Sequence, residues 1–143
     1  IDQWQDGYPN EAVLYSDVES GRGWVFECGG ELAGYVCISM DVEASYAQIE
    51  GRWLTEGDNY AVVHRSMVGD KYRGSRLATE MFSLAFDLAA GLGKASVRVD
   101  THRDNKAMNR LAQKLGFTYC GEVDVSLMDP CRDPKRNAYE KLV

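Results

Sequence analysis

The chain has 143 residues, 45% of them hydrophobic and 27% charged, a size and balance that suit a single domain with one core. Its 16 Lys and Arg against 22 Asp and Glu give a net charge of −6, which argues against a nucleic-acid partner. No apolar run approaches the roughly 20 residues of a membrane span and no signal peptide is visible, so we expect a cytoplasmic protein without a membrane partner. Its two His and four Cys follow no zinc-type spacing, so we expect no metal site.

The first half of the chain predicts a helix followed by a β-hairpin. Residues 11–20 carry apolar side chains at helical spacing and end before a glycine, which indicates a short helix. Residues 23–28 and 31–40 are apolar runs rich in β-branched and aromatic residues. The Gly29-Gly30 pair between them is typical of a two-residue hairpin turn. Residues 46–51 are expected to begin a further strand.

The second half alternates strands with helices, because the hydrophobic spacing changes between a period of two and one of about 3.6. We expect strands at residues 60–68, 95–101, 117–127 and 138–143, a helix at residues 75–90, and a helix from the cap at Asp104 or Asn105 to Lys114. A loop at residues 129–136 precedes the last strand. The order predicts one α/β (α+β) domain over residues 1–143, with a mixed sheet and helices on its faces.

A basic turn lies between the strand at residues 60–68 and the helix that follows it. Backbone N–H groups at a helix start, together with the helix dipole, form an anion site. Lys71, Arg73 and Arg76 add positive charge, and Gly74 allows close approach to the backbone. The spacing fits neither a Walker loop nor a dinucleotide fingerprint. An ordinary turn with solvated basic residues is an equally good interpretation of this pattern alone.

This turn resembles motif A of the GNAT superfamily of N-acetyltransferases, [QR]-x-x-G-x-[GA], in which it binds the pyrophosphate of coenzyme A. Arg73 matches the first position and Ala78 the last. Arg76 stands where the family usually has glycine, so its side chain would either crowd the phosphates or add a guanidinium to them. The resemblance implies acetyl-CoA as co-substrate, bound by Met67, Val68, Lys71, Arg73, Gly74, Ser75, Arg76, Leu77, Ala78 and Asn105.

A second region is similar to motif B of the same superfamily. Residues 100–105 end a strand and open a helix with Asn105, and residues 114–117 contain the Leu-Gly-Phe that leads into the next strand. In the family, this Asn reaches the pantetheine arm; a plain helix cap is the alternative role. Together the motifs resemble a bacterial branch with a mostly antiparallel central sheet. The strand and helix with which family members usually begin are not seen in this sequence. We expect that the given sequence lacks them, and not that the domain is shortened, since loss of that strand would expose a sheet edge.

The resemblance implies an N-acetyltransferase that moves acetyl from acetyl-CoA to a primary amine by direct attack. The acceptor would be a small-molecule or peptide amine, no metal is needed, and a homodimer is left open. A non-catalytic acetyl-CoA sensor is the alternative. It is favoured by Ala112, which occupies the position where the family usually has a proton-donating Tyr.

The catalytic roles are less specific. His64 is the first choice for the base, because it precedes Val68 by four residues and is expected to share its strand face, and the N–H of Val68 is expected to stabilise the oxyanion. The alternative, which the pattern favours, is that His64 is a packed, hydrogen-bonded strand residue. The other candidate bases are Glu50 and Asp100, which could equally form ion pairs with Arg65 or Arg98, and His102, which could simply shape the turn before the helix. Tyr119 or Tyr139 could replace the missing acid, or coenzyme A could leave as the thiolate.

Three aromatic residues are candidates for the acceptor pocket. Trp4 and Tyr8 fall where the family builds that pocket, and Trp53 could join them. Their ring faces would hold a cationic amine. The alternative is that the three rings cover the edge of the core.

Overall fold

One β-sheet forms the centre of the fold. The computed structural model describes residues 3–4, 7–127 and 132–143. The strands are β1 (Gly23–Cys28), β2 (Glu31–Ser39), β3 (Glu50–Gly51), β4 (Tyr60–Val68), β5 (Ser96–His102), β6 (Thr118–Asp124) and β7 (Lys135–Leu142). The helices are α1 (Glu11–Glu19), α2 (Leu77–Gly91) and α3 (Lys106–Lys114), with short 3-10 helices η1 (Ala44–Gln48) and η2 (Asp70–Tyr72).

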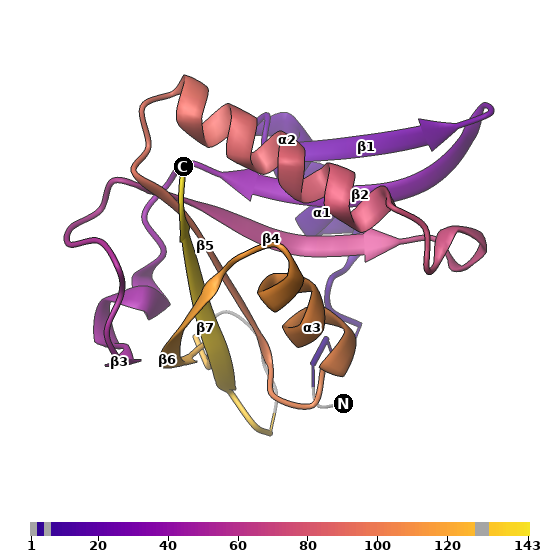
Figure 1. Ribbon diagram of the computed structural model, residues 1–143. Helices are drawn as coiled ribbons and strands as arrows, with labels where there is room; N and C mark the ends of the chain where they lie inside the picture. Colours follow the sequence, from indigo (N-terminus) through magenta and orange to yellow (C-terminus); the bar gives the residue numbers. More distant parts are fainter. Residues whose placement is uncertain (1–2, 5–6, 128–131) are drawn as a thin grey trace.

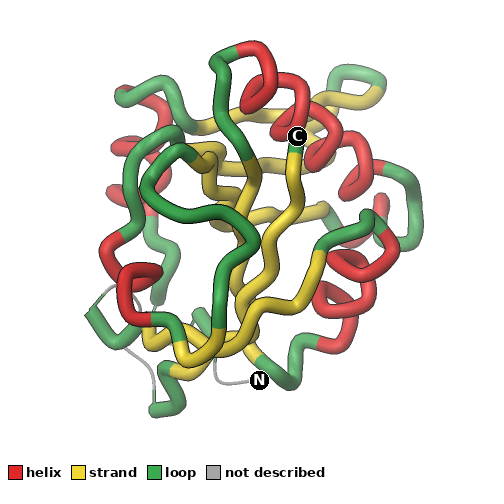
Figure 2. The backbone as a smooth tube through the Cα atoms, turned by 60° about the vertical axis from the view of Figure 1, so that its left-hand side comes forward, coloured by secondary structure: helices red, strands yellow, loops and turns green. Residues whose placement is uncertain are grey.

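The strands follow the order β1-β2-β4-β5-β7-β6-β3 across the sheet (Figure 1). In the described part of the chain, β4 and β5 pair in parallel and all other neighbouring strands pair antiparallel. Figure 2 shows helices on both sides of the strands. The expected mixed, mostly antiparallel α/β fold with helices on both faces is therefore confirmed. None of the helices in the described ranges is long and apolar enough to cross a membrane.

The element boundaries differ from the sequence-based expectation by more than two residues at three places. The strand expected at residues 46–51 is replaced by η1 and the two-residue β3, because the side chain of Glu43 caps the helical turn at Ser45. The strand expected at residues 117–127 ends at Asp124. The last strand begins at Lys135 rather than at residue 138, because Lys135 pairs with β6 and Arg136 pairs with both β5 and β6. Residues 129–131 of the expected loop lie outside the described residues.

Each face of the sheet carries its own hydrophobic cluster. α2 and α3 cover the larger cluster, in which Phe82, Phe86 and Phe117 pack ring against ring. The opposite face carries a smaller cluster, built around Tyr46, Tyr60, Val62, Val123, Val125 and Ala138. Helix α1 lies on this second face, because its Asp17 contacts Tyr35, which alternates along β2 with the core residue Val36.

The parallel strands β4 and β5 stay together over only a short length. They pair at three positions, from Tyr60 with Ser96 to Val62 with Arg98. Beyond these positions β4 continues to Val68 and β5 to His102, and Figure 1 shows the two strands running in different directions. This divergence opens the centre of the sheet.

Helix α2 rests closely on β2 at Gly34. A Cβ added there would lie 2.2 Å from Met81 Cε and 2.9 Å from the carbonyl oxygen of Met67. These distances leave no room for a side chain, so the glycine sets how closely α2 approaches the sheet.

We therefore expect Gly34→Ala to lower the free energy of unfolding by about 1–3 kcal/mol through overpacking. Gly91→Ala is the matched control, because a Cβ in this last turn of α2 would meet no atom within 4 Å. That control is expected to raise stability by about 0.5–1 kcal/mol. Urea unfolding of both variants measures the difference, and equal effects would contradict the close approach.

Candidate active site

A cleft of about 620 Å³ opens where β4 and β5 diverge. On the face covered by α2 and α3, its wall is formed by the turn before α2 and by the first turns of α3. On the other face, its wall is formed by Trp4, Tyr8, Glu43, His64 and Asp100. The cleft thus reaches both faces of the sheet, with a volume in the range of about 300–1,000 Å³ that is usual for small-molecule sites.

The basic turn before α2 presents open backbone to the cleft. Gly74 has a φ of +76°, in the left-handed region, and a Cβ there would meet no atom within 4 Å. Ser75 Oγ accepts a hydrogen bond of 3.2 Å from the N–H of Leu77, which orders the start of the helix. Arg73, Gly74, Ser75 and Ala78 line the cleft. This arrangement suits an anion, because helix N–H groups face one side of the cleft. The guanidinium of Arg73 is exposed and pairs with Asp70 at 2.7 Å, so it would have to turn from Asp70 to bind a ligand there.

Four of the predicted cofactor residues do not line the cleft, namely Met67, Lys71, Arg76 and Leu77. The side chain of Arg76 is 87% exposed and extends along α2 to Glu80, 4.0 Å away, so it does not crowd the turn. Lys71 pairs with Glu31 at 2.6 Å. Leu77 packs into the larger core, and Met67 pairs with Tyr35 of β2.

Asn105 caps α3 and also lines the cleft. Its Oδ1 accepts a hydrogen bond of 3.1 Å from the N–H of Met108, and its Nδ2 donates one of 3.2 Å to Gln3 Oε1. Thr101, on β5 nearby, also lines the cleft. Its hydroxyl is buried and has no hydrogen-bond partner among the described residues, which suits a ligand atom. Sequence reasoning missed Thr101, and only its place in the strand before Asn105 could have indicated it.

A β-bulge in β4 changes which side chains share a face. Val36 of β2 stands opposite both Arg65 and Ser66, and Arg65 has a φ of +44°. The extra residue inverts the alternation, so Val68 packs under α2 while His64 lies on the opposite face with Val62. The expectation that His64 and Val68 share a face is therefore wrong.

The bulge leaves the N–H of Val68 directed toward β5. The N–H of Gly69 donates to the carbonyl of Ala33 at 2.8 Å, so Ala33 and Gly69 form a hydrogen-bonded pair. Bonded and non-bonded pairs alternate along an antiparallel ladder, so the next pair, Gly34 and Val68, is non-bonded. The backbone groups of Val68 consequently point away from β2, into the gap between β4 and β5.

Arg65 fixes the bulge through a buried ion pair. Its Nη2 lies 2.6 Å from Asp17 Oδ1, and its Nε lies 2.9 Å from Asp17 Oδ2, a two-pronged contact with helix α1. Its Nη1 donates to the hydroxyl of Tyr8 at 3.0 Å, and Tyr35 donates to Asp17 at 2.7 Å. Burial alone would raise the pKa of Asp17, but the hydrogen bonds from Arg65 and Tyr35 outweigh it and lower that pKa. Arg65 therefore ties the bulge to α1 and to the N-terminal segment.

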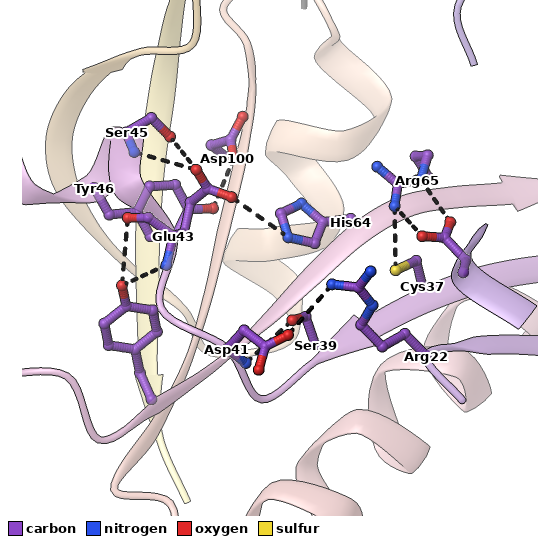
Figure 3. Close-up of polar contacts among 12 residues, drawn as sticks. Arg22, Cys37, Ser39, Asp41, Glu43, Ser45, Tyr46, His64, Arg65 and Asp100 are labelled. Atoms are coloured by element: carbon purple, nitrogen blue, oxygen red, sulfur yellow. Dashed lines mark hydrogen bonds and ion pairs between the residues drawn. The ribbon is translucent and has the colours of Figure 1, made fainter. Parts of the chain in front are cut away.

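His64 faces the carboxylate of Glu43 (Figure 3). His64 Nε2 lies 3.7 Å from Glu43 Oε2. Burial, reinforced by the positive charge of Arg65, lowers the pKa of His64 from 6.5 to about 4, so its imidazole is neutral at pH 7. Glu43 Oε1 accepts hydrogen bonds from the N–H and the hydroxyl of Ser45, at 3.1 and 3.0 Å. Tyr60 fixes the backbone of Glu43, whose N–H donates to the Tyr60 hydroxyl at 3.0 Å.

Asp100 lies beside this pair in the cleft, as Figure 3 shows, and accepts a hydrogen bond of 2.6 Å from the Tyr46 hydroxyl. Sequence reasoning named Asp100 as a candidate base but missed Glu43. Glu43 lies in a segment without hydrophobic periodicity, so no predicted strand or helix placed it near His64. The presence of a carboxylate was the only sign in the sequence that it could belong to the site.

The remaining predicted residues lie away from the cleft. Glu50 forms an ion pair with Lys135 at the edge of the sheet. Tyr119 is 54% exposed and packs edge-on against the ring of Tyr139. Trp53 stacks on the guanidinium of the buried Arg98, 4.2 Å from its ring centre.

Two further candidates for the catalytic roles, His102 and Tyr139, form hydrogen bonds within the fold. His102 accepts a hydrogen bond of 3.1 Å from the N–H of Asp104, and the hydroxyl of Tyr139 donates to Asn109 at 2.7 Å. Of the three aromatic acceptor candidates, Trp4 and Tyr8 are the two that line the cleft.

The lowered pKa of His64 makes folding stability depend on pH. Above pH 6.5 the imidazole is neutral in both the folded and the unfolded chain, so its contribution is fully present. As the pH falls from 6.5 to about 4, the unfolded chain binds a proton that the folded chain does not, and stability falls by up to about 3 kcal/mol. His64→Gln removes this loss, so the free energy of unfolding of the variant should rise relative to the parent chain over that range. Chemical unfolding across pH 4–8 measures it, and a constant difference would refute the buried, neutral histidine.

Comparison with known proteins identifies the family to which this fold belongs. A profile described as the acetyltransferase (GNAT) family matches residues 2–117. A GNAT-family acetyltransferase structure from Streptococcus agalactiae 2603 is 35% identical with a TM-score of 0.82, over 100% of this chain and 79% of that one. A GNAT-family acetyltransferase from Listeria monocytogenes 4b F2365 shares the fold at 21% identity and a TM-score of 0.70, over 96% of this chain and 73% of that one. No curated protein sequence matches the chain.

The family profile covers well over half of the chain. The match to the Streptococcus protein covers the whole of this chain, with the same fold. Both findings agree with the resemblance of the basic turn at the start of α2 to motif A of this family. The chain is therefore an acyltransferase that belongs to the GNAT family of acetyltransferases.

Proposed function

We propose that this protein transfers an acetyl group from acetyl-CoA to a primary amine of a small molecule or a peptide, by direct attack of the amine. The observation that carries the proposal is the cleft between β4 and β5. It reaches from the basic turn of α2 on one face to His64, Glu43 and Asp100 on the other. A site of this form can hold an anionic ligand and an amine at opposite ends, with the reacting atoms between them.

The residues of the α2 face fit coenzyme A. The open backbone at Gly74 and the guanidinium of Arg73 suit the pyrophosphate. The unpartnered hydroxyl of Thr101 and the side chain of Asn105 offer hydrogen bonds to the amides of the pantetheine arm. When bound, acetyl-CoA would supply a thioester carbonyl that an amine can attack.

Val68 is the residue that we propose for stabilising the oxyanion. Its N–H points into the gap between the strands because the neighbouring ladder bond is made by Gly69. A fixed backbone donor in a site shielded from water is a strong source of such stabilisation. The divergence of β5 leaves this N–H without a strand partner on that side.

His64 is the residue that we propose for accepting the proton of the amine. It is neutral at pH 7, so it can accept a proton. A group with a pKa of about 4 is nonetheless a weak base towards an ammonium ion with a pKa near ~10. The site must therefore lower the pKa of the bound amine, and transfer into a buried cleft has this effect on an ammonium group.

The buried Ala112 stands where the family usually has a proton-donating Tyr, and we propose that the leaving sulfur needs no such donor. A thiol with a pKa near that of cysteine, ~8.5, is a tolerable leaving group as its thiolate. Tyr119 and Tyr139 do not line the cleft, so departure as the thiolate is the simplest proposal. The alternative, a non-catalytic sensor of acetyl-CoA, would be supported by binding without turnover of any amine.

Thermal unfolding with excess acetyl-CoA tests the proposed cofactor site. At 100 times its Kd the ligand should add about 2.7 kcal/mol of stability, which raises Tm by roughly 5–10 °C for a domain of this size. Arg73→Ala should reduce the shift, because Arg73 lines the cleft. Arg76→Ala is the matched control and should keep it, because the Arg76 side chain points away from the turn. A missing shift, or equal losses in both variants, would refute the proposed site.

A further inference from the structure

A second cavity, of about 470 Å³, lies between α1 and the end of β2. It shares three residues with the main cleft, Glu43, His64 and Arg65. The second cavity therefore lies directly behind the proposed base, on the face opposite to α2 and α3. Its volume is large enough for a small ligand.

Most of the residues that line this cavity are polar or charged, and polar and apolar atoms share its wall about equally. Asn10 and Ser16 come from the α1 side, and Ser39 and Asp41 come from the end of β2. Asp41 pairs with Arg22 at 3.3 Å, which leaves the rim close to neutral (Figure 3). A wall of hydroxyl, amide and carboxylate groups favours a ligand that forms hydrogen bonds over a purely apolar one.

Glu43 is the exceptional group at the junction of the two cavities. Its side chain is only 9% exposed, and within the described ranges its ion-pair partner is His64, with no Lys or Arg in that role. Ser45 satisfies Oε1, whereas Oε2 faces His64 at 3.7 Å, beyond hydrogen-bond distance. Burial of a carboxylate is costly unless a cation accompanies it. The neutral His64 does not supply that cation, so the site is electrostatically incomplete.

The neighbouring Arg65 does not supply the missing positive charge beside Glu43. Its guanidinium is engaged by both oxygens of Asp17 and by the hydroxyl of Tyr8. Three buried carboxylates therefore lie on this face of the sheet among the described residues. Asp17 pairs with Arg65 and Glu140 pairs with Arg98 at 3.0 Å, whereas Glu43 has no arginine partner.

We propose that Glu43 binds the ammonium group of the acceptor, and that the second cavity holds the rest of a hydrophilic primary amine. This inference rests on the proposed acetyl transfer and names its substrate class. The ammonium supplies the missing positive charge at Glu43 Oε2 and lies next to His64. The carboxylate favours the charged form of the amine and burial opposes it, so Glu43 serves capture of the ammonium, and the amine gives up its proton to His64 before it attacks. Its body extends toward Asn10, Ser16 and Ser39, on the opposite side of the sheet from the basic turn.

Steady-state kinetics with a panel of amines tests the inference. Ethanolamine, glucosamine and spermidine represent hydrophilic amines, and hexylamine and benzylamine represent apolar ones. The hydrophilic amines are expected to have the lower KM. Preference for benzylamine would instead support an aromatic acceptor pocket at Trp4 and Tyr8 and would overturn the inference.

Glu43→Gln removes the charge and keeps an oxygen for Ser45. The KM for the best amine should rise roughly 10- to 100-fold, the loss of a hydrogen bond to a charged group, while kcat at saturation changes much less. The stabilisation by acetyl-CoA should be unchanged. Asp87→Asn, which removes an exposed charge from α2, is the matched control and should leave KM unaltered. A fall in kcat at constant KM would assign Glu43 to proton transfer and overturn the anchoring role.

Ala12→Trp tests the second cavity. Ala12 is exposed on α1 and lines the cavity, whereas Glu19 is exposed on the same helix and does not line it. Ala12→Trp should raise the KM for glucosamine and spermidine more than for ethanolamine, and Glu19→Trp should raise neither. Equal KM values in both variants would exclude the second cavity as the place of the acceptor body.

Calorimetry of amine binding in the presence of coenzyme A separates this inference from the proposed function. Binding that Glu43→Gln abolishes, without any turnover, would overturn acetyl transfer alone. Turnover with a KM that Glu43→Gln does not change would overturn the role of Glu43 alone.

Discussion

The bulge in β4 is the constraint on which the site depends. It holds Arg65 at a φ of +44°, a conformation that costs of order 1 kcal/mol or more for a non-glycine residue. The two-pronged pair with Asp17, together with the contact to Tyr8, compensates for that strain by joining β4 to α1 and the N-terminal segment. Because the bulge inverts the alternation of side chains, His64 and Val68 lie on opposite faces of one strand. The cleft therefore brings Val68, which we propose as the oxyanion donor, and His64, which we propose as the base, to the same gap from opposite faces.

The charges around the bulge divide the site into a structural and a functional part. Asp17 and Arg65 neutralise each other and are held by further hydrogen bonds, which is the arrangement expected of a buried pair that fixes geometry. Among the described residues the carboxylate of Glu43 has no such partner, and the imidazole beside it is neutral because burial, reinforced by the charge of Arg65, lowers its pKa. The same arginine thus fixes the backbone and contributes to the neutral state of His64.

Much of the fold follows from hydrophobic periodicity, because long amphipathic helices and alternating strands leave a local signal. The strand and the helix on either side of the turn from Arg73 to Ala78 leave the same local signal, whereas the anion-binding role of this turn was predicted only through its resemblance to motif A. The bulge gave no signal, because Arg65 and Ser66 are not residues that usually mark one, and a single extra residue reverses every face after it. Glu43 escaped notice because its position is set by partners across the sheet, such as Tyr60, and not by its neighbours in sequence.

The arrangement is also compatible with the anionic co-substrate that we propose, although the chain has a net charge of −6. Salt screens charges beyond about 8–10 Å, so the overall charge matters less than the groups that line the site. On the α2 face these are backbone N–H groups and the guanidinium of Arg73, and on the opposite face they are the carboxylates of Glu43 and Asp100. An anion and a cation are therefore each attracted to a different face. The divergence of β4 and β5 provides the gap in which the two ligands can meet.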